Sequence, residues 1–327
     1  MVRSLGEHLV SKPFTLYWTS LDMYEKCPQS FLWNKGWGTL DVGGGPGKKK
    51  PEPIRDSRHH AVMGIVIQGV LEKLYNDELW KEPHGLADRL LAMVDKEWAY
   101  QTAKKWNWID YRVAGTKESL RQVCREGVLG YLRTMQAHRL LGEWSKAELD
   151  LIGWVDKYNP VGGRPDVVVR RKDTGITILD GKNALSKGKY TDPDQLRWYA
   201  LLFWLSYRQL PDRLAFIYYR YPFGNPVLDS KGNPVLDEAG VPQTETGIDW
   251  VPFTQDDLRG LAQRAVVARR GMDKEKFEAT PSPTTCKFCD YETVCPARQA
   301  QKEANRKRNP KSVDAISGST GFTDFDM

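Results

Sequence analysis

Three charged side chains in one short stretch of the sequence have the types and spacing for metal-assisted phosphate chemistry. Asp166 precedes a run of valines, and Asp180 and Lys182 end a second β-branched run that follows a Lys-Asp-Thr-Gly turn. The two runs predict a β-hairpin. Antiparallel pairing would return Asp166 and Asp180 to the same end of the hairpin. Lys182 would then leave its strand on the same face as Asp180.

Two close carboxylates repel one another unless a cation lies between them. Oxygen ligands that stay open to water suit Mg²⁺ or Mn²⁺, which keep several waters and take further ligands from substrate phosphate. An ammonium group such as that of Lys182 can hold an attacking water and offset charge that develops on a phosphate. The spacing therefore favours phosphodiester hydrolysis. A surface hairpin with ordinary edge charges is the alternative.

A helix is expected directly after the hairpin. Asp192 and Asp194, on either side of Pro193, are both placed to cap its first turn, and an apolar segment follows. On this helix Gln195 and Tyr199 would lie one turn apart on one face. The sequence thus predicts an amide and a phenol side by side, shortly after the acidic hairpin.

The order G-x-x-D, D-x-K and Q-x-x-x-Y resembles the PD-(D/E)XK nuclease superfamily, in its RecB-like exonuclease branch. In that branch the two acids bind the metal, the lysine assists the water, and the glutamine and tyrosine help to position DNA. The resemblance implies a restriction-endonuclease-like α/β fold, with a central mixed sheet flanked by helices. By position, it assigns these roles to Asp166, Asp180, Lys182, Gln195 and Tyr199, with the Gly181 carbonyl as a further metal ligand.

Gln68 and Glu148 are further candidates for the metal site. RecB-like nucleases commonly carry G-x-x-x-H-x-x-L-E on an earlier helix, and its histidine contributes to the metal site. Here Gln68 follows Gly64 at the histidine position. An amide can offer an oxygen or bond a metal-bound water, but it is not an imidazole ligand. Glu148 lies in residues 144–158, which alternate enough to predict one strand, and a paired surface charge is its alternative role.

Four of the five cysteines form a second group of candidate ligands. Cys286, Cys289 and Cys295 have the spacing C-x2-C-x5-C, and Cys27 lies near the other end of the sequence. Four thiolates can hold Zn²⁺ or an iron-sulfur cluster. The split arrangement resembles the [4Fe-4S] staple of the AddB nuclease domain and of CRISPR-associated adaptation nucleases, which implies such a cluster, with zinc as the alternative. Cys124, in an amphipathic stretch, is expected to be a small buried hydrophobe.

The resemblance extends over most of the chain and implies one nuclease domain over residues 1–300. Within it we expect a helical insertion at about residues 80–142, a hairpin insertion at 222–250 and the cysteine cluster at 286–295. Residues 301–327 are predicted to be a tail whose basic part extends a helix and whose remainder is disordered. We hypothesise that the tail docks onto a protein partner, although a solubilising role is the alternative.

Local patterns predict three further elements. Residues 16–33 are predicted to be one helix with Ser20 as its cap. Residues 213–221 form an apolar run typical of a buried strand. Residues 254–270 have an amphipathic pattern that opens with T-x-x-D, which predicts a capped helix.

Composition favours a soluble protein and is compatible with nucleic-acid binding. The 327 residues carry a formal net charge of +6, with basic clusters at Lys48–Lys50 and Arg306–Arg308. A mild basic excess is compatible with DNA binding. No apolar run approaches the length of a membrane span, and the N-terminus lacks the apolar core of a signal peptide, so we expect a cytoplasmic protein. The sequence contains no G-x-x-x-x-G-K-[ST] phosphate loop, so the expected substrate is DNA that is single-stranded or has free ends.

Together these features predict a metal-dependent DNA exonuclease that serves recombination, repair or replication, such as a phage or mobile element would use. A non-catalytic DNA-binding scaffold is one alternative, because Gln68 replaces the histidine. A nuclease that trims DNA for CRISPR arrays is another, since it would share the same motifs.

Overall fold

The computed structural model describes residues 14–35, 58–105, 108–188, 191–221, 224–236, 240–287 and 289–308. Contacts along the chain divide these residues into two compact units. The first contains residues 14–18 and 58–267, and the second contains residues 19–35 and 268–308. The assignment of one domain to residues 1–300 stays a prediction.

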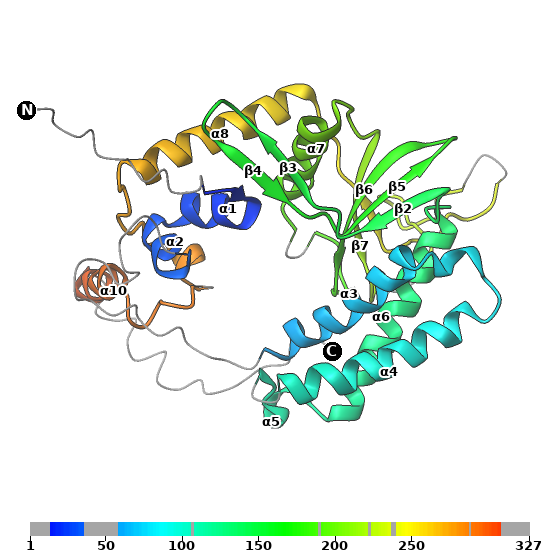
Figure 1. Ribbon diagram of the computed structural model, residues 1–327. Helices are drawn as coiled ribbons and strands as arrows, with labels where there is room; N and C mark the ends of the chain where they lie inside the picture. The colour runs from blue at the N-terminus through cyan, green and yellow to red at the C-terminus, as the bar shows by residue number, and fades with distance from the viewer. Residues whose placement is uncertain are drawn as a thin grey trace, which may run out of the picture. The chain divides into compact units, whose positions relative to one another are not determined.

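A five-stranded sheet lies at the centre of the first unit (Figure 1). The strands lie in the order β2 (Trp144–Ala147), β5 (Val167–Arg171), β6 (Gly175–Lys182), β7 (Arg213–Tyr218) and β8 (Ile248–Trp250). Strands β6 and β7 pair in parallel and the other neighbours pair antiparallel, so the sheet is mixed. The predicted hairpin is confirmed as β5 and β6. Val167 pairs with Leu179, which brings Asp166 and Asp180 to the same end.

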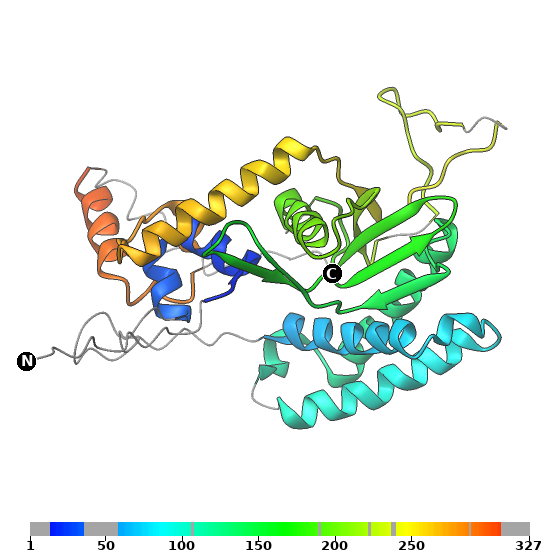
Figure 2. The same cartoon turned by 45° about the horizontal axis from the view of Figure 1, so that its top comes forward.

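Helices cover both faces of this sheet (Figures 1 and 2). One face packs against α3 (His59–Asn76) and α6 (Lys117–Ala137), with α4 (Leu86–Lys104) behind them. The other face packs against α7 (Pro193–Tyr207). Because both faces are covered, β5 is a continuous run of buried valines. The predicted mixed α/β fold is confirmed, and the remaining short helices of this unit are η1 (Leu79–Lys81) and α5 (Tyr111–Ala114).

A smaller sheet of three strands lies against α7. Its order is β1 (Leu16–Tyr17), β4 (Pro160–Gly163) and β3 (Leu151–Trp154). The prediction of one strand over residues 144–158 is therefore wrong, because β2 and β3 belong to different sheets. The chain breaks at Glu148, which has φ of +52° in the left-handed region. Apolar and polar residues alternate in the sequence on both sides of this break. The pattern therefore gives no sign that the chain passes from one sheet to the other.

The second unit contains most of α1 (Trp18–Lys26), then α2 (Pro28–Lys35), the end of α8 (Gln255–Asp273), α9 (Pro283–Lys287) and α10 (Pro296–Arg308). The prediction of one helix over residues 16–33 is wrong, since Leu16 and Tyr17 form a strand and the chain breaks at Cys27. Pro28 cannot donate a helical hydrogen bond and restricts the residue before it. Ser20 lies inside α1 and is buried, so it is no cap. Helix α10 contains the basic part of the predicted tail.

Two local predictions hold and others lie outside the described residues. The predicted hairpin insertion at 222–250 extends too far, because residues 248–250 form β8 of the main sheet. The strand over residues 213–221 is present as β7, and α8 opens with the predicted cap, because Thr254 and Asp257 exchange hydrogen bonds. Isolated bridges in the described parts of residues 224–246, such as Leu228 to Pro234, form a projecting arm (Figure 2). The lysine cluster at residues 48–50 and the tail from 309 to 327 are outside the described residues. No helix in the described ranges has the length and apolar character to span a bilayer.

Candidate active site

The two acids of the hairpin lie where β5 begins and β6 ends. Asp180 is 3% exposed and its Oδ1 accepts a hydrogen bond from Gln195 Nε2 at 2.9 Å. Asp166 Oδ2 accepts one from the backbone N–H of Gly181 at 2.7 Å. Strand β6 therefore carries Asp180 and, through the backbone of Gly181, also binds the Asp166 side chain. This holds both carboxylates at one end of the sheet.

Lys182 and the first turn of α7 complete this group. Lys182 Nζ donates to Gln195 Oε1 at 3.0 Å and lies 2.5 Å from Asp180 Oδ2. Gln195 Nε2 also lies 3.4 Å from the Tyr199 hydroxyl, which is one helical turn away. The structure thus brings together the five residues Asp166, Asp180, Lys182, Gln195 and Tyr199.

The cap of α7 holds Gln195 in position. Asp192 accepts a hydrogen bond from the backbone N–H of Asp194 at 3.0 Å, so Asp192 caps the helix. The sequence alone did not decide between Asp192 and Asp194. The Asp194 side chain pairs instead with Arg197 at 2.9 Å and Arg264 at 2.5 Å. These contacts fix the turn from which Gln195 reaches the hairpin.

Glu148 and Gln68 lie beside the acids and bond to one another. Gln68 Nε2 donates to Glu148 Oε1 at 2.8 Å. The backbone N–H of Glu148 donates to the carbonyl of Asp166 at 3.1 Å, and Arg164 Nε lies 3.8 Å from Glu148 Oε2. A left-handed backbone at a non-glycine residue is strained, and such strain persists only where surrounding contacts hold it. Gln68 therefore positions Glu148, whereas a metal-ligand role for either residue stays a prediction.

Tyr219 is a site residue that the sequence did not indicate. It is buried, and its hydroxyl donates to Gln68 Oε1 at 3.3 Å. The same hydroxyl occupies the space that a Cβ on Gly181 would take. Its sequence signal is weak, because it is one of several tyrosines at the end of the predicted strand. Tyr219 thus explains why glycine stands between Asp180 and Lys182.

The acids have pKa values above their ordinary range. Burial raises the pKa of Asp180, although the neighbouring Lys182 opposes the rise. Burial and the charge of Asp180 raise the pKa of Asp166 well above its usual value, against the hydrogen bond from Gly181. Burial also raises the pKa of Glu148. Raised pKa values in neighbouring acids favour either bound protons or a bound cation.

A divalent cation fits this arrangement of residues. Asp180 Oδ2 is buried and forms an ion pair with Lys182 Nζ at 2.5 Å. A hard cation bound by Asp166 and Asp180 would offset their repulsion and the cost of their burial, which raises the pKa values of both. In the described ranges, no three or more His, Cys, Asp or Glu side chains are grouped as a metal site. Asp166 and Asp180 would hold Mg²⁺ or Mn²⁺ with water, backbone and phosphate oxygens as the other ligands.

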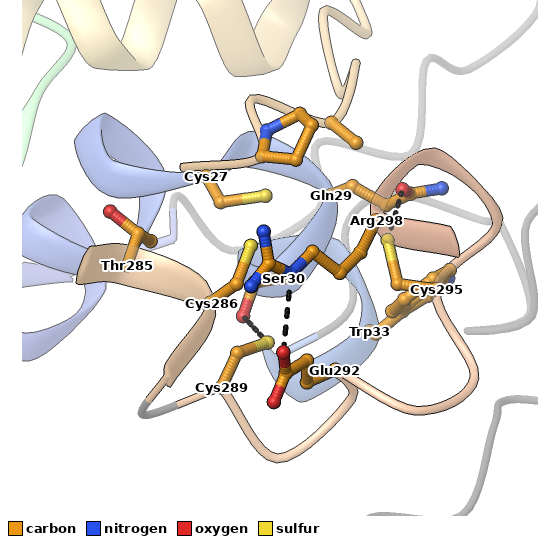
Figure 3. Close-up of a pocket in the computed structure, with 12 residues that line it drawn as sticks. Cys27, Gln29, Ser30, Trp33, Thr285, Cys286, Cys289, Glu292, Cys295 and Arg298 are labelled. Atoms are coloured by element: carbon orange, nitrogen blue, oxygen red, sulfur yellow. Dashed lines mark hydrogen bonds and ion pairs between the residues drawn. The ribbon is translucent and has the colours of Figure 1, made fainter. Parts of the chain in front are cut away.

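Four cysteines line a separate pocket within the second unit (Figure 3). Cys27, Cys286, Cys289 and Cys295 surround a cavity of about 20 Å³, little more than one water needs. Burial raises the pKa of Cys289, and Cys27 and Cys286 add to the rise. The donor set fits a thiolate-bound metal, but in the described residues the sulfurs are not grouped closely enough for one. Cys124 is fully buried elsewhere, as predicted, and burial raises its pKa to about 12.

Polar side chains also contact this pocket. Ser30 Oγ lies 3.7 Å from Cys289 Sγ, and Cys295 Sγ lies 3.9 Å from Gln29 Oε1. Figure 3 shows these contacts beside the ion pair of Arg298 with Glu292, whose Nε to Oε1 distance is 3.1 Å. Polar side chains thus border a pocket whose Cys295 belongs to a small apolar cluster with Trp33 and Tyr291.

Residues 18–296 match the sequence model of the PD-(D/E)XK nuclease superfamily. This match covers most of the chain, so the chain belongs to that superfamily, and membership indicates a hydrolase that acts on nucleic acid. A search of curated proteins gives no match. Among solved structures, that described as "Crystal structure of SSO0001" is similar at 14% sequence identity, over 56% of this chain and 79% of that chain, with a TM-score of 0.29.

Proposed function

We propose that the chain is a Mg²⁺- or Mn²⁺-dependent DNA exonuclease of the RecB-like branch that serves recombination, repair or replication. The observation that supports this most is the group formed by Asp166, Asp180, Lys182 and Gln195 at one end of the sheet. Its chemistry suits phosphodiester hydrolysis, since it combines a buried acid, a second, partly buried acid and an ammonium that is held beside them.

The roles of the residues follow from their contacts. Asp166 and Asp180 would hold the cation, with the Gly181 carbonyl as a further ligand, and the bound cation would polarise the phosphate and lower the pKa of a water. Lys182 is placed to hold the attacking water and to offset the charge of the transition state. Gln195 bonds both Asp180 and Lys182, so it is a positioning residue, and Tyr199 lies within reach of Gln195.

A cleavage assay with a matched control tests this function. Linear and circular DNA would be incubated anaerobically with Mg²⁺ or Mn²⁺ and with wild type, Lys182→Ala or Lys172→Ala. Lys172 lies in the turn at the other end of the same hairpin, and its side chain is 89% exposed. We expect wild type and Lys172→Ala to degrade linear DNA only, and Lys182→Ala to be slower by about 10²- to 10³-fold. Equal rates for all three proteins would contradict the assignment.

We also propose that Cys27, Cys286, Cys289 and Cys295 hold a [4Fe-4S] cluster, with zinc as the alternative. The support is that four thiols of distant sequence position line one pocket. The pocket would have to widen to admit a cluster, and folding around the metal would supply that rearrangement. Iron and sulfide content with visible absorption after anaerobic purification would indicate the cluster, whereas one zinc and no visible absorption would indicate the alternative.

A non-catalytic DNA-binding subunit is a second candidate function. It is favoured by the bonding of Gln68, whose amide is engaged by Glu148 and Tyr219 where relatives carry a histidine ligand. Wild type that binds DNA and cleaves none, with either metal, would support this candidate.

A further inference from the structure

The small sheet has an exposed face that carries aromatic side chains. Register places Ile152, Gly162 and Tyr17 in one row across β3, β4 and β1. On this face Tyr17 is 46% exposed, Ile152 is 60% exposed and Trp154 is 51% exposed. The side chains of the opposite face are buried, because that face packs against α7. The aromatic residues thus lie on the solvent side of the sheet.

Glycine shapes the middle of this exposed face. A Cβ on Gly162 would lie 3.3 Å from Cε1 of Tyr17, so the tyrosine ring lies over the backbone of β4. Ile152 borders the same glycine from β3, and Trp154 is two residues further along that strand. Successive side chains on one face of a strand are about 7 Å apart. Tyr17 and Trp154 therefore form two flat surfaces on neighbouring rows of one face.

The exposed face leads to the candidate active site. Arg164 directly follows Gly163, the last residue of β4, and Tyr17 is among the groups that raise its pKa. Its Nε lies 2.8 Å from Asp150 Oδ1 and 3.8 Å from Glu148 Oε2, and its side chain remains 55% exposed. Glu148 in turn bonds the backbone of Asp166. A strand of nucleic acid whose phosphate lies at the acids would pass Arg164 and then meet this face.

We propose that the face formed by Tyr17, Ile152, Trp154 and Arg164 is a stacking platform for a single nucleic-acid strand. The proposal rests on the proposed nuclease function and specifies its substrate. Aromatic side chains stack on bases of any sequence, but they reach base faces only when the strand is unpaired. The guanidinium of Arg164 provides the positive charge for the phosphate nearest the acids. Continuity with the catalytic group favours nucleic acid over a protein as the occupant.

The test is a binding measurement that does not depend on cleavage. A fluorescent oligothymidine and a duplex of equal length would be titrated with the full chain in EDTA, where metal-dependent hydrolysis cannot occur. We expect Tyr17→Ala and Trp154→Ala each to weaken binding of the single strand by about 5- to 150-fold, and Trp154→Phe to retain most of the affinity. Trp144→Ala is the matched control, since Trp144 is 45% exposed on β2 of the other sheet, and it should bind as wild type does.

Each outcome separates the platform from the nuclease. Wild-type affinity for both alanine variants, or an equal loss on duplex and single strand, would overturn the platform and would leave a protein partner as the occupant. Weaker binding of the single strand in variants of an enzyme that cleaves nothing would support the platform and contradict the nuclease. Thermal melting of each variant would show that weaker binding does not result from unfolding.

Discussion

Asp180 lies in surroundings that do not suit a free carboxylate. It is 3% exposed, and its two oxygens contact the side chains of Gln195 and Lys182. Lys182 compensates part of its charge, yet burial still raises the pKa of Asp180. A buried acid of this kind is costly for the metal-free protein, and such residues are candidates for a functional site.

We predict that Asp180→Asn abolishes cleavage and stabilises the metal-free protein. The amide keeps the shape of the side chain while it removes a metal ligand and the repulsion with Asp166. The rate of cleavage should fall by at least about 10²-fold, which is the usual effect of removing one group that stabilises a transition state. Melting temperature in EDTA should rise. The control is Asp173→Asn in the exposed turn of the same hairpin, which should change neither quantity, and a lower melting temperature for Asp180→Asn would contradict the prediction.

The same acids predict how stability depends on pH. Because the folded-state pKa values of Asp166, Asp180 and Glu148 are raised, the native metal-free protein binds more protons than the unfolded chain. Their contribution is therefore fully present below the ordinary carboxyl pKa of about 4 and is lost as pH rises through the raised values.

Urea unfolding in EDTA at several pH values between 5 and 8 measures this effect. The free energy of unfolding of wild type, relative to that of Asp180→Asn, should fall as pH rises. Added Mg²⁺ should reverse the trend, since a cation binds the charged carboxylates and stabilises the folded state. A relative stability that rises with pH in EDTA would contradict the raised pKa values.

At the scale of elements, the end of β6 packs against Tyr219 so closely that residue 181 must be glycine. We predict that Gly181→Ala destabilises the protein by about 1 to 3 kcal/mol, the usual cost of overpacking a core. Gly64→Ala is the control, because no other atom lies near the position of a Cβ on Gly64, and it should be neutral or stabilising in its helix. Urea unfolding measures both, and equal stabilities for the two variants would contradict the packing.

Sequence reasoning succeeds where a local signal specifies an element. The valine run and the turn predicted β5 and β6, and Asp192 and Thr254 predicted the starts of α7 and α8. The order of three motifs was enough to predict which side chains meet across the hairpin and α7.

Other features depend on contacts between distant residues and had no local signal. The break at Glu148 follows from a change of sheet, which the alternating pattern conceals. Tyr219 contacts Gly181 and Gln68 through tertiary packing, so nothing in its own neighbourhood marks it. In the sequence, Gln68 stands where relatives carry a histidine ligand of the metal. In the structure, its side chain donates a hydrogen bond to Glu148.

At the scale of the whole molecule, the two candidate metal sites belong to different units. The acids lie in the first unit and the four cysteines in the second, which brings together segments from both ends of the sequence. Tyr24, Phe31 and Phe277 make ring contacts within that unit, and a core this small would gain stability if the proposed metal were bound.

We predict that Cys289→Ala lowers the melting temperature of anaerobically purified protein. Removal of the metal from wild type should have the same effect, because both changes remove the link between the segments of the second unit. After metal removal, wild type and variant should melt alike. Wild type that melts at the same temperature with and without metal would show that the cysteines do not hold this unit together.

The dependence of cleavage on added metal tests the assignment of the acids most directly. End-labelled linear DNA would be incubated with excess protein while Mn²⁺ is titrated in, for wild type, Asp180→Asn and Asp173→Asn. We expect cleavage that rises to saturation with Mn²⁺ for wild type and Asp173→Asn and stays at background for Asp180→Asn at every concentration. Cleavage by Asp180→Asn at the wild-type rate, or cleavage by wild type that persists in EDTA, would contradict a metal-dependent nuclease centre built on Asp166 and Asp180.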